Sequence, residues 1–222
     1  MFDFFYQSKQ NWLTALRNAS FRNKFIPAFI LLAGILAAMP FFFPAIEKRN
    51  GTSLHDWILE RLPSYNLSVA IFIIIWSTGL LAIIRAMKDP YIFLVFAWSY
   101  IFVSAMRAAA ITFIPLNPPA GLVLLIDPLS NTFYGNATIT KDLFFSGHTS
   151  TIFLIFLCLK HKADKVLTLT AMFFLAILLM LQHIHYVIDI VAAPVFTYIS
   201  YLIGKRIVYG ESKKNQETRN NA

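Results

Sequence analysis

Two histidines and an aspartate stand at spacings suited to chemistry at phosphorus. His185 and Asp189 are four residues apart, so they share one face if that stretch is helical. A carboxylate that accepts a proton from one imidazole nitrogen fixes the tautomer and makes the other nitrogen a better nucleophile. His148 follows a Ser-Gly pair and can give a proton to a leaving oxygen. These three residues are therefore candidate catalytic groups.

Four further residues are candidates for holding a phosphate. Ser146 is a suitable N-cap for a helix, whose free first-turn amides attract an anion, and Gly147 lets a ligand approach the backbone. Arg107 has a permanent charge and a fork of donors that fits phosphate. Asp142 orients a substrate or His148, or is merely a loop residue before the helix. We expect phosphoryl transfer with no metal and no cofactor.

The composition places these residues in a membrane protein. Of 222 residues, 58% are hydrophobic and 22 are Phe, while 14% are charged, against about 25% in a typical soluble chain. This excludes a soluble globular domain, a disordered chain and a disulfide scaffold. The net charge of +8 is better explained by basic residues at a membrane surface than by nucleic acid, which we do not expect as a partner.

The fold class predicted is all-α, a polytopic bundle of six transmembrane helices. Residues 1–24 read as an amphipathic, interfacial arm or a solvated one, residues 25–208 as one membrane domain, and residues 209–222 as a polar tail for which we predict disorder. A short surface helix is expected in 51–65. The expected spans, of which the fourth is the shortest, are 25–46, 67–86, 91–116, 146–160, 164–184 and 187–208.

Lys and Arg set the expected orientation. Six spans place fourteen of these residues on the side of the termini and four on the other side, while Arg107 lies within a span. Because cytoplasmic loops carry the excess of basic residues, both termini are expected in the cytoplasm. Arg107, His148, His185 and Asp189 then converge near the periplasmic or exoplasmic face. The charge count makes no use of these residues, so their convergence is independent support for a site.

Two motifs carry a resemblance to a known family. Residues 145–149 (FSGHT) and 185–189 (HYVID) resemble the signature motifs of the type 2 phosphatidic acid phosphatase superfamily. The sphingomyelin synthase branch is the closer match. Its G-D-x-x-x-S-G-H-T block is kept in residues 141–149 except for the leading Gly, and its H-x-H-Y-x-x-D block is matched by residues 183–189.

The rest of the resemblance is looser. Arg107, followed by Thr112 and Pro115, is similar to an Arg-containing block of that branch that ends in T-x-L-P. The K-x6-R-P block of the phosphatase branch is missing, and Leu179 stands where that branch has an Arg. Both departures favour a headgroup transferase over an ordinary lipid phosphatase.

The resemblance implies an integral membrane phosphotransferase acting through a phosphohistidine. It would move a phospho-headgroup from a phospholipid to a lipid alcohol, either ceramide or diacylglycerol; the alternative is a lipid phosphate phosphatase with water as acceptor. A non-enzymatic lipid transporter remains a further reading, because intramembrane charges also mark substrate paths. His185 with Asp189 also fits a structural helix pair, and Arg107 a purely stabilising ion pair. Donor headgroup and oligomeric state are not readable from the sequence.

Overall fold

The computed structural model describes residues 2–125 and 139–220, and within them the chain is helical with no β-strand. The bends and caps follow local sequence: Asn18 caps the second helix through its side chain, and Asp89 caps the fourth in the same way ahead of Pro90. The helices are α1 (Phe2–Arg17), α2 (Ala19–Glu47), α3 (Ser68–Lys88), α4 (Pro90–Phe113), α6 (Gly147–Cys158), α7 (Lys162–Leu181) and α8 (Val187–Asn220), with a 3-10 turn at Leu59–Arg61.

Five of the helices in the described ranges are long and apolar enough to cross a membrane, namely α2, α3, α4, α7 and the part of α8 up to Gly210. The sixth expected span is represented by α6, which has 12 residues and rises only about 18 Å, against the roughly 30 Å of a hydrocarbon core. The sequence therefore located all six apolar segments, but length alone supports five as spans. The polar segment after Gly210, for which we predicted disorder, continues the backbone of α8 to Asn220.

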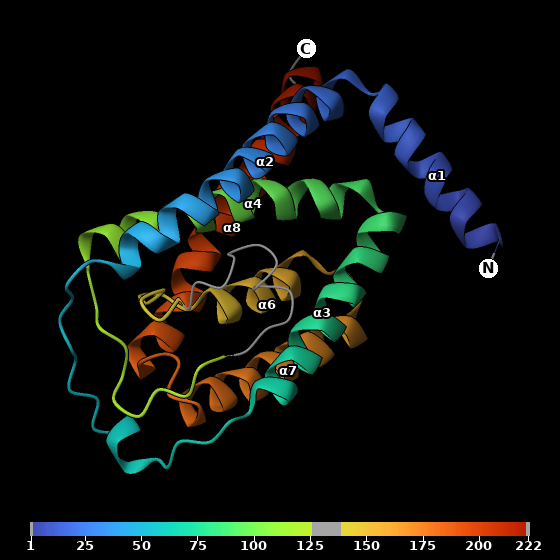
Figure 1. The fold of residues 1–222 in the computed structure, drawn as a ribbon. Coiled ribbons are helices and arrows are strands. Elements are labelled where there is room, and N and C mark those ends of the chain that lie inside the picture. The colour runs from blue at the N-terminus through green and yellow to red at the C-terminus, as the bar shows by residue number, and fades with distance from the viewer. Residues whose placement is uncertain (1, 126–138, 221–222) are drawn as a thin grey trace.

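The short helix α6 lies inside the bundle (Figure 1). It contacts α3, α4, α7 and α8, while α2 packs across α4 on the outside and α1, at one edge, contacts α2, α3 and α4. Leu154 of α6 is fully buried against α4, and Ile152 packs with residues of α3 and α7. Large apolar side chains on the outer faces of α2, α3 and α7 are exposed, as expected of surfaces that meet lipid.

From α2 to α8, with the short α6 included, successive helices run in alternating directions, so their ends form two layers (Figure 1). One layer holds the end of α3, both ends of the α6–α7 connection and the start of α4. There Arg85 makes a bidentate ion pair with Asp164 at 2.7 and 3.0 Å, and Lys160 pairs with Asp89. Asn11 of α1 donates to the carbonyl of Lys88 at 2.8 Å, which fixes α1 to the same layer.

The opposite layer is made of loops joined by backbone hydrogen bonds. Thr52 pairs with the segment that follows α4, as an isolated bridge to Leu116. Gln182, fully buried after α7, accepts from Leu67 N at 3.0 Å and donates to Ser68 Oγ at 2.9 Å. Its amide also lies within 3.3 Å of the Val123 carbonyl. This one side chain thus links the start of α3, the end of α7 and the segment 115–125.

The surface helix expected in 51–65 is wrong; only the 3-10 turn Leu59–Arg61 forms there. Long-range hydrogen bonds hold the segment instead. Thr52 N donates to the carbonyl of Pro115 at 2.9 Å, and Leu54 N donates to Tyr186 Oη at 3.2 Å. A helix would also need the carbonyls of Gly51 and Thr52, but these accept from the side chain and the backbone N of Asn117 at 2.7 and 3.0 Å. Tertiary contacts therefore override the local 3.6-residue periodicity.

The helix pair α4–α8 is the most extensive of the bundle, and a glycine sets its closest approach. A Cβ on Gly204 would lie 2.3 Å from Ser99 Oγ and 2.7 Å from Ser99 N. Ser99 is fully buried, and part of the obstacle is backbone, which cannot rotate away. Small residues at such contacts let membrane helices approach each other closely.

We therefore predict that Gly204→Ala destabilises the protein by about 1–3 kcal/mol, because the added methyl group overpacks the α4–α8 contact. The measurement is thermal unfolding in detergent. Gly79→Ala is the matched control, since a Cβ there meets nothing within 4 Å and Ala is the better helix former. A Gly204→Ala protein that melts at or above the wild-type temperature would contradict the packing account.

Candidate active site

The sequence-predicted residues come together at the layer of helix ends that contains the start of α6. Arg107 lies on α4, Asp142 and Ser146 precede α6, Gly147 and His148 begin it, and His185 and Asp189 flank the start of α8. Hydrogen bonds join α4 to the segment before α6, and the start of α6 in turn contacts the start of α8. The expected convergence is thus found within the described residues.

Ser146 caps α6 as expected. Its side-chain oxygen accepts from Thr149 N at 3.4 Å and from Thr149 Oγ1 at 3.2 Å, and the residue is fully buried. Its own backbone N donates to the carbonyl of Asp189 at 3.0 Å. The cap therefore also ties the start of α6 to the first turn of α8, which the spacing of the two motifs could not show.

Gly147 lies directly under the guanidinium of Arg107. A Cβ at this position would be 2.5 Å from Arg107 Cζ and 2.6–2.7 Å from its two terminal nitrogens. We expected this glycine to admit a ligand to the backbone; in the structure the space above it is occupied by Arg107. The absence of a side chain at residue 147 is what lets a cation from α4 sit at the N-terminus of α6.

Arg107 is held by two acceptors from the segment before α6. Its Nε donates to the carbonyl of Phe145 at 3.2 Å, and a terminal nitrogen donates to Asp142 Oδ1 at 2.5 Å. The side chain of Arg107 is only 12% exposed, so a nearby carboxylate is needed to offset the cost of burying its charge. Asp142, left open between a site role and a loop role, is thus the ion-pair partner of Arg107.

The segment that carries Asp142 is fixed by buried aromatic and aliphatic side chains. Leu143 and Phe145 are buried, and Phe145 stacks on Phe196 of α8 with ring centroids 4.8 Å apart. Phe144 has a φ of 45°, a left-handed conformation that non-glycine residues adopt rarely. Burial of its two neighbours holds this strained turn, which reverses the chain toward α6.

His185 and Asp189 meet in a different way from the shared helical face we expected. α8 begins at Val187, so His185 lies in the turn before it. Asp189 is the third residue of the helix, and its Oδ2 accepts from Tyr186 N at 3.1 Å, the reciprocal half of a capping box. The same Oδ2 lies 3.4 Å from His185 Nδ1. The four-residue spacing therefore arises because Asp189 caps the start of α8 and, from that position, also faces the ring of His185.

The His185–Asp189 contact is electrostatic and longer than a good hydrogen bond. His185 Nδ1 and Asp189 Oδ1 have no hydrogen-bond partner among the described residues, although His185 is 2% and Asp189 0% exposed. Hydrogen bonds of catalytic groups are often long without substrate and tighten in the reacting complex. Since Nδ1 faces the carboxylate, Nε2 is the nitrogen on the far side of the ring.

His148 lies beside His185. Their ring centroids are 6.3 Å apart at an interplanar angle of 63°. His148 is half-buried, in the first turn of α6, whereas His185 is buried. Two imidazoles from different segments are thus placed where one phosphoryl group can lie against both.

Two residues that position this turn were not singled out in the sequence. Asp56 accepts from Val187 N at 2.8 Å, and its other oxygen accepts from Ile58 N and Leu59 N at 3.2 Å. Tyr186 is buried, accepts from Leu54 N and donates to the carbonyl of Asn117 at 3.0 Å. Burial raises the pKa of the Tyr186 hydroxyl, which favours the protonated donor form. Tyr186 lies inside the second motif, but no local signal links Asp56 to a helix start 131 residues away.

His183, the other histidine of the second motif, belongs to the loop layer. Its Nδ1 lies 2.7 Å from the carbonyl of Ala120 and its Nε2 lies 3.2 Å from that of Leu62. Both ring nitrogens are therefore engaged with backbone, and the residue has a positive φ of 54°. It joins the segments around 62 and 120 beneath the His185 turn.

Within the described residues, no group of three or more His, Cys, Asp or Glu is arranged to hold a metal ion.

Part of the chain is similar to a known protein family. Residues 141–206 match the family model described as PAP2 superfamily C-terminal. The matched range contains Asp142, Ser146, Gly147, His148, His185 and Asp189. The match supports the type 2 phosphatidic acid phosphatase superfamily and an enzyme of the phosphatase or phosphotransferase type. No curated protein and no solved structure matches the chain significantly.

Gly147→Ala should move the guanidinium of Arg107 while leaving the fold intact. The added methyl group must displace the guanidinium, which is the flexible end of a side chain, so stability should change little. Displacement by about 1 Å at a reacting centre costs on the order of 100-fold in rate. We predict such a loss of lipid-phosphate turnover with thermal unfolding close to wild type.

Gly34→Ala is the control for this variant, because a Cβ at Gly34 meets nothing within 4 Å and the residue is on α2, outside the site. Its turnover should be unchanged. Full activity in Gly147→Ala would mean that the guanidinium position is unimportant.

Proposed function

We propose that the chain is an integral membrane lipid phosphotransferase that moves a phospho-headgroup from a phospholipid to a lipid alcohol through a phosphohistidine. The observation that carries the proposal is the meeting of His148, His185 and Asp189 within the range matched by the PAP2 superfamily C-terminal model, with Arg107 of α4 at the start of α6. Residues 25–208 form the proposed catalytic unit.

In the first step, His185 Nε2 attacks the phosphorus of the donor lipid. The N–P bond forms as the bond from phosphorus to the departing lipid oxygen breaks, and His148 gives that oxygen a proton. Asp189, 3.4 Å from Nδ1, stabilises the positive charge that develops on the His185 ring.

In the second step, the acceptor reverses these events. His148, now unprotonated, takes the proton of the acceptor hydroxyl, whose oxygen attacks phosphorus as the N–P bond breaks. Ceramide or diacylglycerol as acceptor gives a new phospholipid; water gives a lipid phosphatase, which is the alternative function. The missing K-x6-R-P block and Leu179 favour the transferase.

The phosphoryl oxygens need a positive surface during both steps. Arg107 and the amides at the start of α6 can supply it. Asp142 occupies one terminal nitrogen of Arg107, so the incoming phosphate must share the guanidinium with this carboxylate or displace it. We assign Asp142 the role of holding Arg107 in place until the substrate phosphate arrives.

The first test replaces the proposed nucleophile. We predict that His185→Ala lowers headgroup transfer by about three orders of magnitude or more, since removing a nucleophile leaves only binding and electrostatic stabilisation. The assay mixes purified protein with phospholipid and either ceramide or diacylglycerol and uses mass spectrometry to measure both new phospholipid and the hydrolysis product. That product is the free phospho-headgroup from a phosphodiester donor or inorganic phosphate from a lipid phosphate. Which product dominates decides between transferase and phosphatase.

His161→Ala is the matched control, because His161 is exposed in the opposite layer and caps α7 without a side-chain bond. It should keep full activity. A His185→Ala protein that turns over lipid at the wild-type rate would refute the mechanism.

We further propose that catalysis takes place at the periplasmic or exoplasmic face, with both termini in the cytoplasm. The two layers of helix ends support this. The layer of Arg85, Lys88, Lys160 and Lys162 carries the excess of basic residues, and the candidate site lies in the other. Because α6 is short, its N-terminus would lie below the membrane surface, where a phospholipid headgroup can reach it.

Cysteine labelling of intact cells tests this orientation. In a Cys158→Ser background, we predict that Asn50→Cys reacts with an impermeant maleimide and that Lys162→Cys does not, since both positions are exposed but lie in opposite layers. Permeabilised cells should label both. Labelling of Lys162→Cys alone would invert the topology.

A further inference from the structure

Helix α1 lies across the layer of helix ends that is opposite the candidate site, and it crosses the direction of α2 (Figure 1). Trp12 packs against Phe21 at the start of α2 and against Phe93 at the start of α4. The ammonium of Lys88, at the end of α3, lies 4.8 Å from the centre of the Phe4 ring. Phe4 and Trp12 are about 12 Å apart along the helix. The helix therefore runs along this layer and not down the bundle.

Hydrogen bonds from two side chains of α1 fix how the helix is rotated about its axis. Trp12 Nε1 donates to the carbonyls of Ala86 and Met87 at 3.3 and 3.1 Å, and the amide of Asn11 donates to the carbonyl of Lys88 at 2.8 Å. These carbonyls belong to the last turn of α3, where they have no partner within the helix. α1 thus caps the end of a long apolar helix with one defined face.

The side chains of α1 fall into three sectors around the helix, as its period of 3.6 residues places them. The sector that faces the bundle contains Phe4, Ser8, Asn11, Trp12 and Ala15. A polar sector, each residue of which is exposed, contains Asp3, Gln7, Gln10, Thr14 and Arg17. Between these two lies an apolar sector of Phe5, Tyr6, Lys9, Leu13 and Leu16. Its three large exposed side chains, Phe5, Tyr6 and Leu13, are 54%, 67% and 40% exposed.

The apolar sector adjoins a surface that meets lipid. Only Asn18 separates α1 from α2, and large exposed apolar side chains of α2 begin two turns into that helix, at Ile26, Phe29 and Ile30. Since α2 is long and apolar enough to cross a membrane, its first turns lie where the hydrocarbon core gives way to headgroups. α1 is therefore held at the depth of the membrane surface.

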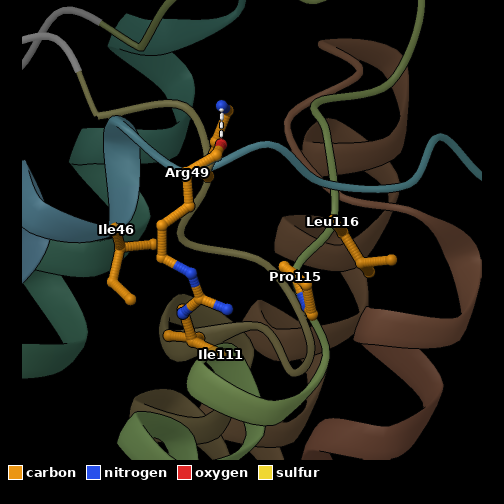
Figure 2. A pocket seen from close by; sticks show the side chains of 6 residues that line it. Ile46, Arg49, Ile111, Pro115 and Leu116 are labelled. Atoms are coloured by element: carbon orange, nitrogen blue, oxygen red, sulfur yellow. Dashed lines mark hydrogen bonds between the residues drawn. The ribbon is translucent and has the colours of Figure 1, made fainter.

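The other end of α2 shows apolar side chains that the protein covers itself. Ile46 and Ile111 are buried there, and Figure 2 shows the side chain of Arg49 beside both of them. A terminal nitrogen of Arg49 donates to the carbonyl of Thr112 at 2.7 Å, which keeps the side chain in this position. At this contact the apolar side chains have protein partners, whereas the apolar sector of α1 is left open.

The charge of the N-terminal segment indicates which surface covers the open sector. Residues 1–24 contain Lys9, Arg17, Arg22 and Lys24 but one acidic residue, Asp3. Lys9 lies within the apolar sector, where the stem of a lysine can lie along apolar surface while its ammonium reaches the headgroups. A helix with an apolar face and an excess of basic residues binds anionic lipid surfaces.

We propose that α1 is an interfacial helix bound to the anionic surface of the leaflet on the side of Arg85 and Lys160. Phe5, Tyr6 and Leu13 enter the boundary between headgroups and acyl chains, and the polar sector stays in water. Because α1 also caps α3, it fixes the end of that helix to the membrane surface. The proposal does not rest on the proposed catalytic function, since the candidate site lies in the opposite layer.

Spin labelling of the full-length protein in lipid nanodiscs tests the position of α1. In a Cys158→Ser background, a nitroxide is attached to Leu13→Cys or to its matched control Thr14→Cys, which is the next residue but belongs to the polar sector. We expect the ratio of collisions with oxygen to collisions with a water-soluble nickel complex to be several times higher at Leu13→Cys. Thermal unfolding checks that each labelled protein is folded, and the pair Phe5→Cys and Gln7→Cys repeats the comparison.

Two results would overturn the interfacial position. Free access of the nickel complex to the label at Leu13→Cys would mean that the apolar sector is solvated. Protection of that label from both oxygen and nickel would mean that a protein surface, such as a second copy of the chain, covers it.

The lipid charge is tested by comparing discs of phosphatidylcholine alone with discs that also contain phosphatidylglycerol. We expect the oxygen-to-nickel ratio at Leu13→Cys to rise in the anionic discs and the rise to be smaller in Lys9→Gln. Lys162→Gln is the matched control, because it removes an exposed cation of the same layer outside α1, and it should keep the full rise. No rise, or an equal rise in all three proteins, would overturn the assignment to an anionic surface.

Discussion

The placement of one arginine within an apolar bundle constrains the whole site. A guanidinium near the end of α4 is costly unless it meets an anion and hydrogen-bond acceptors. Asp142 and the carbonyl of Phe145 supply these, and Gly147 supplies the space. For all three to reach Arg107, the chain before α6 must turn sharply inward, which accounts for the burial of Leu143 and Phe145 and the left-handed turn at Phe144.

At the start of α8, one residue must cap the helix, orient His185 and hold the start of α6. Asp189 caps its own helix through Tyr186 N, faces His185 Nδ1, and receives Ser146 N on its backbone carbonyl. A carboxylate that is fully buried and already bound to the backbone has little freedom to move, so the imidazole beside it is oriented by a rigid group. Asp56 and Tyr186 extend that rigidity to the loop layer outside it.

The two layers of helix ends use charge differently. In the layer of the termini, cations meet carboxylates, as in Arg85–Asp164 and Lys160–Asp89. At the rim of the candidate site, Glu47 binds backbone amides and a threonine hydroxyl instead, while Arg49 and Lys141 donate to carbonyl groups. This leaves net positive charge beside the candidate site.

The sequence alone determined the class of protein, the approximate helix bounds and the candidate residues. Helices in lipid must be long and apolar, so composition and hydrophobic length identify them locally. Ser146 was a readable N-cap, and the spacing from His185 to Asp189 indicated a contact, although a cap and not a shared helical face produces it.

Tertiary structure decided what fills the spaces between these segments. Arg107 and Asp142 are 35 residues apart, and Asp56 and Val187 are 131 apart. Hydrogen bonds over such separations leave no periodic trace in the chain. Other long-range bonds replaced the helix expected in 51–65, because the carbonyls of Gly51 and Thr52 accept from Asn117 and are not available to a local helix. Local pattern reports the preference of a segment in isolation, and its long-range partners decide the final conformation.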